Sequence, residues 1–205
     1  MILLAIRPAL SVFILLTVVT GIAYPLLVTG VAQAAFPHAA NGSIVSVNGR
    51  TVGSSLIGQA FSEPQYFWSR PSATSTLPNN GMASGGSNLG ANNPALLEAV
   101  SQRIAALRTA DPGNSLPVPI DLVTASGSGL DPDISLAAAA YQVPRIARER
   151  GLSPQAVQAL IDAQAQRPFL GVIGEPRVNV LALNLALNLA PNQTTQIGQQ
   201  PPPAR

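Results

Sequence analysis

The residues whose types and spacing best suit chemistry form a glycine–serine stretch, ASGSGLDPDIS, at positions 125–135. Successive backbone N–H groups in a glycine-rich turn ahead of a helix favour an anion, and serine hydroxyls add hydrogen-bond donors. The stretch is therefore a candidate phosphate contact. Asp131 and Asp133 follow the glycines and serines within this stretch and would repel a phosphate unless a cation intervened.

Two other interpretations of the stretch need weighing. A calcium loop counted from Asp131 fails, because position 6 is Leu136 instead of glycine and position 12 is Gln142 instead of glutamate. A helix entry fits, since Asp133 or Ser135 can cap the alanine-rich pattern that follows. The phosphate contact and the structural helix entry both stay open on the local residues.

Composition excludes several kinds of catalysis. The chain contains neither lysine nor cysteine, whereas a Walker A loop, a protein kinase and a P-type ATPase each need a lysine. Its single histidine, His38, has no acidic neighbour close in sequence, so a serine-hydrolase triad has one weak candidate base. Aromatic residues make up 4% of the chain, and the arginines form no basic stripe, so we expect no nucleic-acid partner.

The N-terminal segment, residues 1–35, has the character of a membrane anchor. No charge occurs from Pro8 to Val31, long enough for a helix to cross the bilayer core of about 30 Å. Arg7 precedes the run and no arginine follows before Arg50, which places the N-terminus in the cytoplasm and the rest outside. A cleaved signal peptide is the alternative, but its apolar region would be shorter.

Residues 36–190 read as one extracytoplasmic α+β domain, and the Pro- and Gln-rich tail, 191–205, as disordered. The aromatic trio at 66–68 reads as a strand-like core segment, and 178–189 as a helix, with a strand as the alternative. The other expected elements are a hairpin about Asn48-Gly49, a loop over 78–94, a helix starting at Asn93, a helix ending at Gly151 and bent or interrupted at Pro144, and a helix starting at Ser153.

The order of the segments is more specific than any one of them. After the uncharged run with Tyr24-Pro25 come FPHAANGS, VGSSLIGQAF, YFWSRPSA, SGGSNLG, SGSGLDPDIS, YQVPRIARERG and GEPRVNVLALNLAL. In this order they resemble the KdpC family, small accessory subunits of the bacterial Kdp potassium-transporting P-type ATPase. The resemblance runs from about Ile6 to Leu189 and leaves out only the tail.

The resemblance implies an inner-membrane assembly with a channel-like potassium-binding subunit, a P-type ATPase subunit and a small membrane peptide. It implies a non-catalytic subunit that stabilises the assembly and acts as a catalytic chaperone, raising the ATP affinity of the hydrolysing subunit, with no cofactor or metal of its own. The implied nucleotide contacts are Ser126, Gly127, Ser128, Gly129 and Gln142.

The charge argument places this domain outside the cytoplasm, where ATP is scarce. On physical grounds we therefore favour a stabilising role on the extracytoplasmic face of the channel-like subunit. A different class of function is an anchored ligand-binding domain acting alone, with the 78–94 loop and the aromatic trio as its pocket. Copurification with large hydrophobic partners would separate the two.

Overall fold

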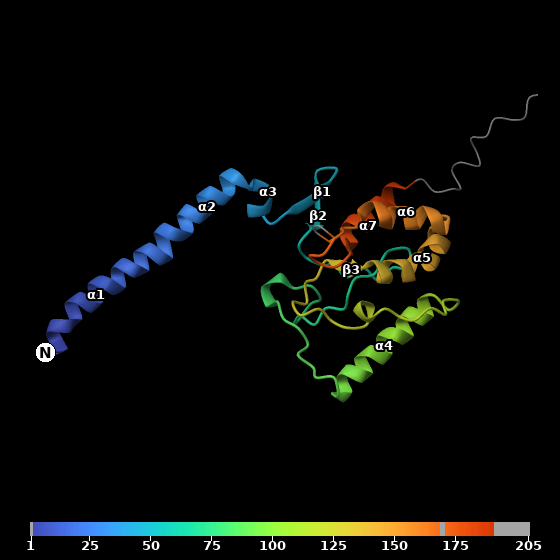
Figure 1. Cartoon of the computed structure of the whole chain (residues 1–205), viewed down its shortest axis with the longest axis horizontal. Helices are drawn as coiled ribbons and strands as arrows, with labels where there is room; N and C mark the ends of the chain where they lie inside the picture. Colours follow the sequence, from blue (N-terminus) through green and yellow to red (C-terminus); the bar gives the residue numbers. More distant parts are fainter. Residues whose placement is uncertain (1, 169–170, 191–205) are drawn as a thin grey trace, which may run out of the picture. The chain divides into compact units, whose positions relative to one another are not determined.

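A computed structural model describes residues 2–168 and 171–190, which form two compact units that divide between Ser54 and Ser55 (Figure 1). The first unit begins with helix α1, Ile2–Val18, a π-helical turn η1, Val19–Ala23, and helix α2, Tyr24–Ala35. Together they give one continuous apolar helix over Ala5–Ala35 with a mean hydropathy of 2.2 and none of it buried within the chain. This helix is long and apolar enough to cross a membrane.

The π-helical turn η1 directly precedes Tyr24-Pro25. Pro25 has no backbone N–H, and its ring in a regular α-helix would press against the carbonyl of Gly21, four residues earlier. A π turn is wider than an α turn and appears inside helices as a single-turn bulge. The helix thereby passes the proline and continues to Ala35.

The first unit ends in a short helix α3, Pro37–Ala40, and a hairpin of β1, Ile44–Val47, with β2, Arg50–Ser54. Asn48 and Gly49 both have positive φ, 52° and 76°, as the two-residue turn of a hairpin requires. The hairpin predicted from Asn48-Gly49 is thus confirmed.

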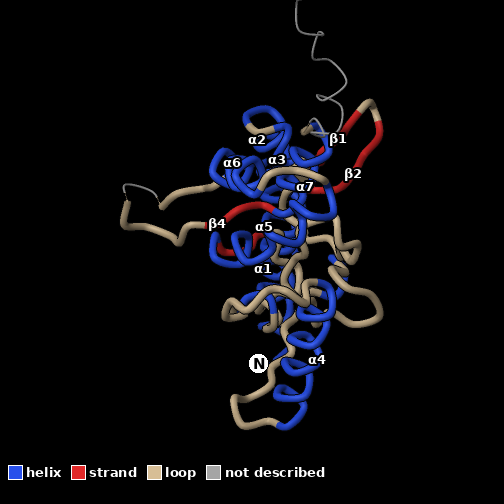
Figure 2. Tube along the Cα trace, turned by 90° about the vertical axis from the view of Figure 1, so that its right-hand side faces the viewer, coloured by secondary structure: helices blue, strands red, loops and turns tan. Residues whose placement is uncertain are grey.

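The second unit combines helices with a two-stranded antiparallel sheet, which confirms the α+β class (Figure 2). Helices α5, α6 and α7 pack in succession against one another and against this sheet, around buried residues such as Ile134, Ile146 and Leu183. The elements are η2, Gly81–Ala83; α4, Pro94–Ala110; η3, Ile120–Leu122; β3, Asp133–Ser135; α5, Leu136–Arg150; α6, Pro154–Gln164; β4, Arg177–Asn179; and α7, Val180–Leu189.

Side-chain caps begin helices α4, α6 and α7, and the starts of α4 and α6 are those predicted from the sequence. Asn93, Ser153 and Asn179 each accept a hydrogen bond from a backbone N–H in the first turn of α4, α6 and α7. Such side-chain acceptors satisfy N–H groups that have no partner inside the helix. Gly151 ends α5 in the left-handed conformation with φ 62°, a position that glycine occupies without steric cost.

Three expectations need correction or refinement. The aromatic run 66–68 is not a strand. The interruption considered at Pro144 does not occur, because α5 continues through Pro144 to Arg150. Segment 178–189 contains both alternatives in turn, a strand to Asn179 and then a helix. The tail predicted to be disordered, 191–205, lies outside the described residues.

Candidate functional site

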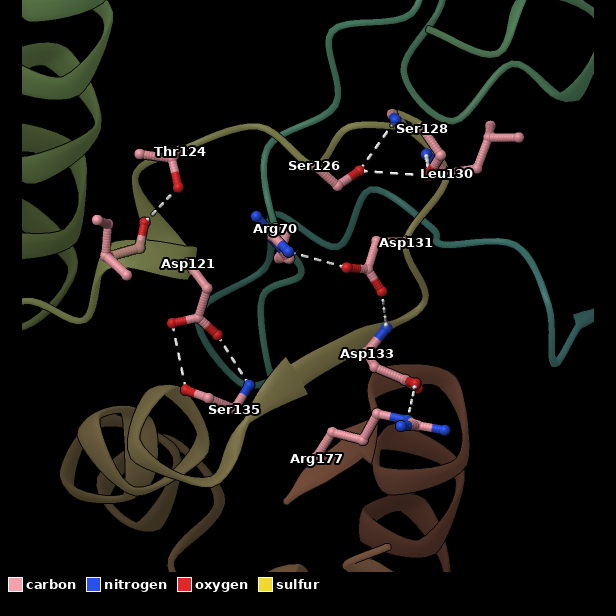
Figure 3. Close-up of polar contacts among 12 residues, drawn as sticks. Arg70, Asp121, Thr124, Ser126, Ser128, Leu130, Asp131, Asp133, Ser135 and Arg177 are labelled. Atoms are coloured by element: carbon pink, nitrogen blue, oxygen red, sulfur yellow. Dashed lines mark hydrogen bonds and ion pairs between the residues drawn. The ribbon is translucent and has the colours of Figure 1, made fainter. Parts of the chain in front are cut away.

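Two serine hydroxyls close the glycine–serine loop, residues 126–129, on itself. Ser126 is buried, and its Oγ accepts a hydrogen bond from the Gly129 N–H at 2.9 Å. The exposed Ser128 accepts one from the Leu130 N–H at 3.1 Å. The two Oγ atoms lie 3.5 Å apart (Figure 3). These are local side-chain-to-backbone bonds of the kind that serine forms in turns.

A second loop, around Ser84 and Gly85, lies directly against the glycine–serine loop. The Gly85 N–H and the Ser84 hydroxyl both donate to the Ser128 carbonyl, at 2.8 Å and 3.0 Å. Gly129 has φ +68°, and a Cβ added there would lie 2.6 Å from the Gly85 carbonyl oxygen. Position 129 therefore requires glycine for the packing of two loops.

Two backbone donors of the loop remain available. Within residues 2–168 and 171–190, the N–H groups of Gly127 and Ser128 meet no hydrogen-bond acceptor, and both residues are exposed. A Cβ added at Gly127 would have no atom within 4 Å, so this side of the loop is open. Consecutive unpaired N–H groups favour an anion, and these two are the atoms that a phosphate would meet.

The acidic residues beside the loop are paired with arginines. Asp131 Oδ2 lies 2.9 Å from Arg70 Nη1, and Asp133 Oδ2 lies 2.8 Å from Arg177 Nε (Figure 3). Burial raises the pKa of the Asp133 carboxyl, and the charge of Arg177 opposes that rise. The cations needed to offset the carboxylates near a phosphate are thus present in the chain itself.

Helix α5 begins at Leu136, with Ser135 as its N-cap, and not at the loop. Ser135 Oγ accepts the Ala138 N–H at 3.0 Å, while the Ser135 N–H donates to Asp121 at 2.8 Å (Figure 3). Strand β3 lies between the loop and the helix in sequence, so residues 126–129 do not form the N-terminal turn of α5. The cap prediction is confirmed for Ser135 and wrong for Asp133, because Asp133 belongs to β3 and pairs with Arg177.

Gln142, the fifth predicted contact residue, lies in the core of the second unit with 1% of its surface exposed. Its Oε1 accepts hydrogen bonds from the Trp68 N–H at 2.7 Å and from Arg145 Nη2 at 2.6 Å. These bonds join α5 to the aromatic trio, whereas Ser126–Gly129 bond to the loop at Ser84 and Gly85. The structure gathers four of the predicted residues in one loop and gives Gln142 a separate structural task.

A buried arginine is the feature that sequence reasoning missed. Only 2% of Arg145 is exposed, although arginine is rarely found buried in proteins. It donates to the backbone carbonyls of Pro64 and Tyr66, and its Cζ lies 4.6 Å from the centre of the Trp68 ring. Burial lowers its pKa to about 10. The aromatic trio at residues 66–68 was the available signal in the sequence, since aromatic rings attract arginine.

The neighbouring arginines of α5 also have internal partners. Arg148 Nη1 lies 2.7 Å from Asp111 Oδ1, and Arg150 lies 4.8 Å from the Tyr66 ring centre. The described residues contain no cluster of three His, Cys, Asp or Glu side chains that would hold a metal ion, and His38 is exposed. Among the described residues, the exposed N–H groups of Gly127 and Ser128 thus remain the candidate anion contact.

The fold thus defines a class of proteins in which one apolar N-terminal helix, long enough to cross a membrane, precedes an α+β domain. The family model for KdpC, described as "K+-transporting ATPase, c chain", matches residues 6–189. The chain belongs to the KdpC family.

Curated relatives agree with the family match. The chain is 65% identical over 183 residues to a potassium-transporting ATPase KdpC subunit of Variovorax paradoxus, covering 89% of this chain and 95% of the relative. It is 62% identical over 182 residues to the subunit of the same name from a Janthinobacterium species, covering 89% and 96%. A third, from Methylibium petroleiphilum, is 63% identical over 182 residues, covering 89% and 95%.

Proposed function

We propose that the chain is an accessory subunit of an ATP-driven potassium-uptake complex and that it stabilises the assembly without catalysing a reaction itself. The observation that carries the proposal is the family match over residues 6–189, nearly the whole described chain. The relatives bear the name of a subunit of a potassium-transporting ATPase. An apolar helix over Ala5–Ala35 with no covering contacts inside the chain supports a place in the membrane beside other subunits.

Copurification tests this function. The chain, tagged at its C-terminus, would be expressed together with the other Kdp subunits and extracted in a mild detergent. We expect a channel-like subunit, a P-type ATPase subunit and a small membrane peptide to purify with it in fixed proportion. Full assembly and potassium-dependent ATP hydrolysis in a strain that lacks the chain would contradict the proposal and favour an anchored ligand-binding domain acting alone.

We further propose that the domain lies outside the cytoplasm, with the N-terminus inside. The charge asymmetry between Arg7 and Arg50 across the uncharged run supports this orientation. Alkaline phosphatase, which is active only outside the cytoplasm, would be fused after Gly198, and a reporter that fluoresces only in the cytoplasm would be fused at the same place. An active phosphatase and a dark reporter are expected; the reverse result would overturn the orientation.

A second candidate function, raising the ATP affinity of the hydrolysing subunit, has one observation in its favour: the unpaired N–H groups of Gly127 and Ser128. The test is Ser128→Asp, which places a negative charge where a phosphate would lie, beside Ser115→Asp at another exposed loop serine. Nucleotide contact requires the KM for ATP of the whole complex to rise about tenfold or more in the first variant alone. An equal KM in both variants would limit the loop to a structural role.

A further inference from the structure

A cavity of about 460 Å³ opens in the second unit, at the side of helix α4. This volume lies within the range of sites for small organic ligands, roughly 300–1,000 Å³. It is separate from the glycine–serine loop, since none of residues 126–129 lines it. Most of its wall is apolar, formed by Phe61, Trp68, Pro71, Ala106, Leu107 and Leu122.

The charged residues in the wall of this cavity have one sign. Arg70 and Arg103 line it, and none of its described lining residues is acidic. Arg70 Nη1 is paired with Asp131, but its buried Nε has no hydrogen-bond partner among the described residues. An apolar wall with a few placed polar donors is the usual composition of a ligand site.

Of the two arginines in the wall, Arg103 is the one without a counter-ion among the described residues. Its Nη1 donates to the Val123 carbonyl at 2.7 Å, and no carboxylate in the described part of the chain lies within ion-pair distance of it. The side chain is partly buried, and that burial lowers the pKa of its guanidinium. A charge taken partly out of water without a counter-ion costs free energy. An anion bound beside Arg103 would offset this desolvation cost.

We propose that this cavity binds a small amphiphilic anion, with its carboxylate or phosphate on Arg103 and its apolar body against Phe61, Trp68 and Leu107. A cation is disfavoured because both charged residues in the wall are arginines. A free inorganic anion would leave the apolar wall uncovered, and a neutral hydrocarbon would leave Arg103 unpaired. Only a ligand with both parts uses both features of the cavity. The inference is independent of the role in a potassium-transporting complex.

The cavity carries its own reporter, because Trp68 is the only tryptophan of the chain. The full chain would be placed in nanodiscs of zwitterionic phosphatidylcholine and titrated with octanoate while Trp68 emission is recorded. Octanol, octylammonium and inorganic phosphate are the comparison probes, because each lacks one property of the proposed ligand. We expect saturable binding of octanoate at least tenfold tighter than binding of any of the three.

Variants on helix α4 test the role of Arg103. Arg103→Gln should weaken octanoate at least tenfold and leave octanol unchanged, and Arg103→Lys should restore part of the loss. Arg108→Gln, at an exposed arginine of the same helix that does not line the cavity, should bind octanoate like the parent chain. Circular dichroism of each variant confirms that it is folded.

A membrane lipid and a soluble carboxylate are the two sources of such an anion. Replacing part of the phosphatidylcholine with phosphatidylglycerol separates them: an Arg103-dependent change in Trp68 emission without octanoate indicates the lipid, and octanoate binding alone indicates the soluble acid. Equal binding of octanol and octanoate, tighter binding of octylammonium, or no change on Arg103→Gln in a folded chain would each overturn the proposal.

Discussion

The side-chain amide of Gln142 holds the backbone of Trp68 as a neighbouring strand would, with Oε1 2.7 Å from the Trp68 nitrogen and Nε2 3.2 Å from the Trp68 carbonyl oxygen. Asn184 of α7 does the same for Phe67, at 2.8 Å and 3.0 Å. Two amides on two helices thus take the place of a strand partner for the backbone of Phe67 and Trp68. Phe67 is fully buried.

Removing the Gln142 amide should destabilise the domain strongly. Gln142→Ala leaves the Trp68 N–H and an Arg145 donor without their acceptor in a buried place, and each unsatisfied buried donor costs about 1–3 kcal/mol. We expect a loss of at least about 2 kcal/mol, measured by denaturant unfolding of the full chain in detergent with Trp68 emission as the signal. The exposed Gln155→Ala should change stability by less than about 0.5 kcal/mol. Equal stability of the two variants would show that the hydrogen bonds of the Gln142 amide do not stabilise the domain.

The two glycines of the glycine–serine loop should respond oppositely to alanine. Gly129 has φ +68°, and a Cβ there would lie 2.6 Å from a backbone oxygen, so Gly129→Ala should cost about 1–3 kcal/mol or more. Gly127 has neither a positive φ nor a close neighbour. Gly127→Ala should therefore be neutral or stabilising by up to about 1 kcal/mol. Denaturant unfolding of the two variants tests this difference. Comparable losses of unfolding free energy in both would contradict the loop packing described here.

The sequence predicts best where structure follows from neighbouring residues. Asn48-Gly49, Asn93-Pro94 and Ser153-Pro154 carry their turn or cap chemistry locally, and each prediction was correct. The uncharged run likewise specifies an apolar helix without reference to the rest of the chain.

Predictions failed where a distant residue decides the local structure. The aromatic run has the composition of a strand, but its partners are the amides of Gln142 and Asn184, 74 and 117 residues away in sequence. Arginine is rarely buried, so only the fold shows that backbone carbonyls accept hydrogen bonds from Arg145. For the candidate site, the loop of residues 126–129 was recognisable, whereas the cavity beside Arg103 depends on segments joined only by folding.

The membrane helix offers a test of docking at Gly21, in the π-helical turn. A Cβ added at Gly21 would meet no atom of this chain within 4 Å, so Gly21→Leu leaves the chain itself unstrained. Small residues allow neighbouring membrane helices to approach closely, and Thr17 lies four residues before Gly21 on the same face. We expect Gly21→Leu to reduce the partner subunits recovered with the tagged chain several-fold.

Gly30→Leu is the matched control, because this glycine is equally open but lies about two and a half helical turns later, on a different face. Thermal unfolding of the second unit should be unchanged in both variants. Full recovery of the partners with Gly21→Leu, or an equal loss with Gly30→Leu, would rule out a docking face centred on the π turn.

The pair Asp133–Arg177 predicts the pH dependence of stability. Burial raises the pKa of Asp133 in the folded chain, and Arg177 only partly opposes it. The folded state therefore binds the Asp133 proton more tightly than the unfolded state does, and protonation of this group stabilises the fold. The gain appears as the pH falls through the raised pKa and is complete below the unfolded value of about 3.9. The free energy of unfolding of the parent chain, minus that of Asp133→Asn, should thus increase from pH 7 to pH 4.

The variant Arg177→Gln is the control for this prediction, because the charge that opposes the rise in pKa is gone. The corresponding difference, taken between Arg177→Gln and the double variant, should begin to increase at a higher pH. A difference that shrinks as the pH falls would mean that the ion pair at 2.8 Å outweighs burial and lowers the pKa instead.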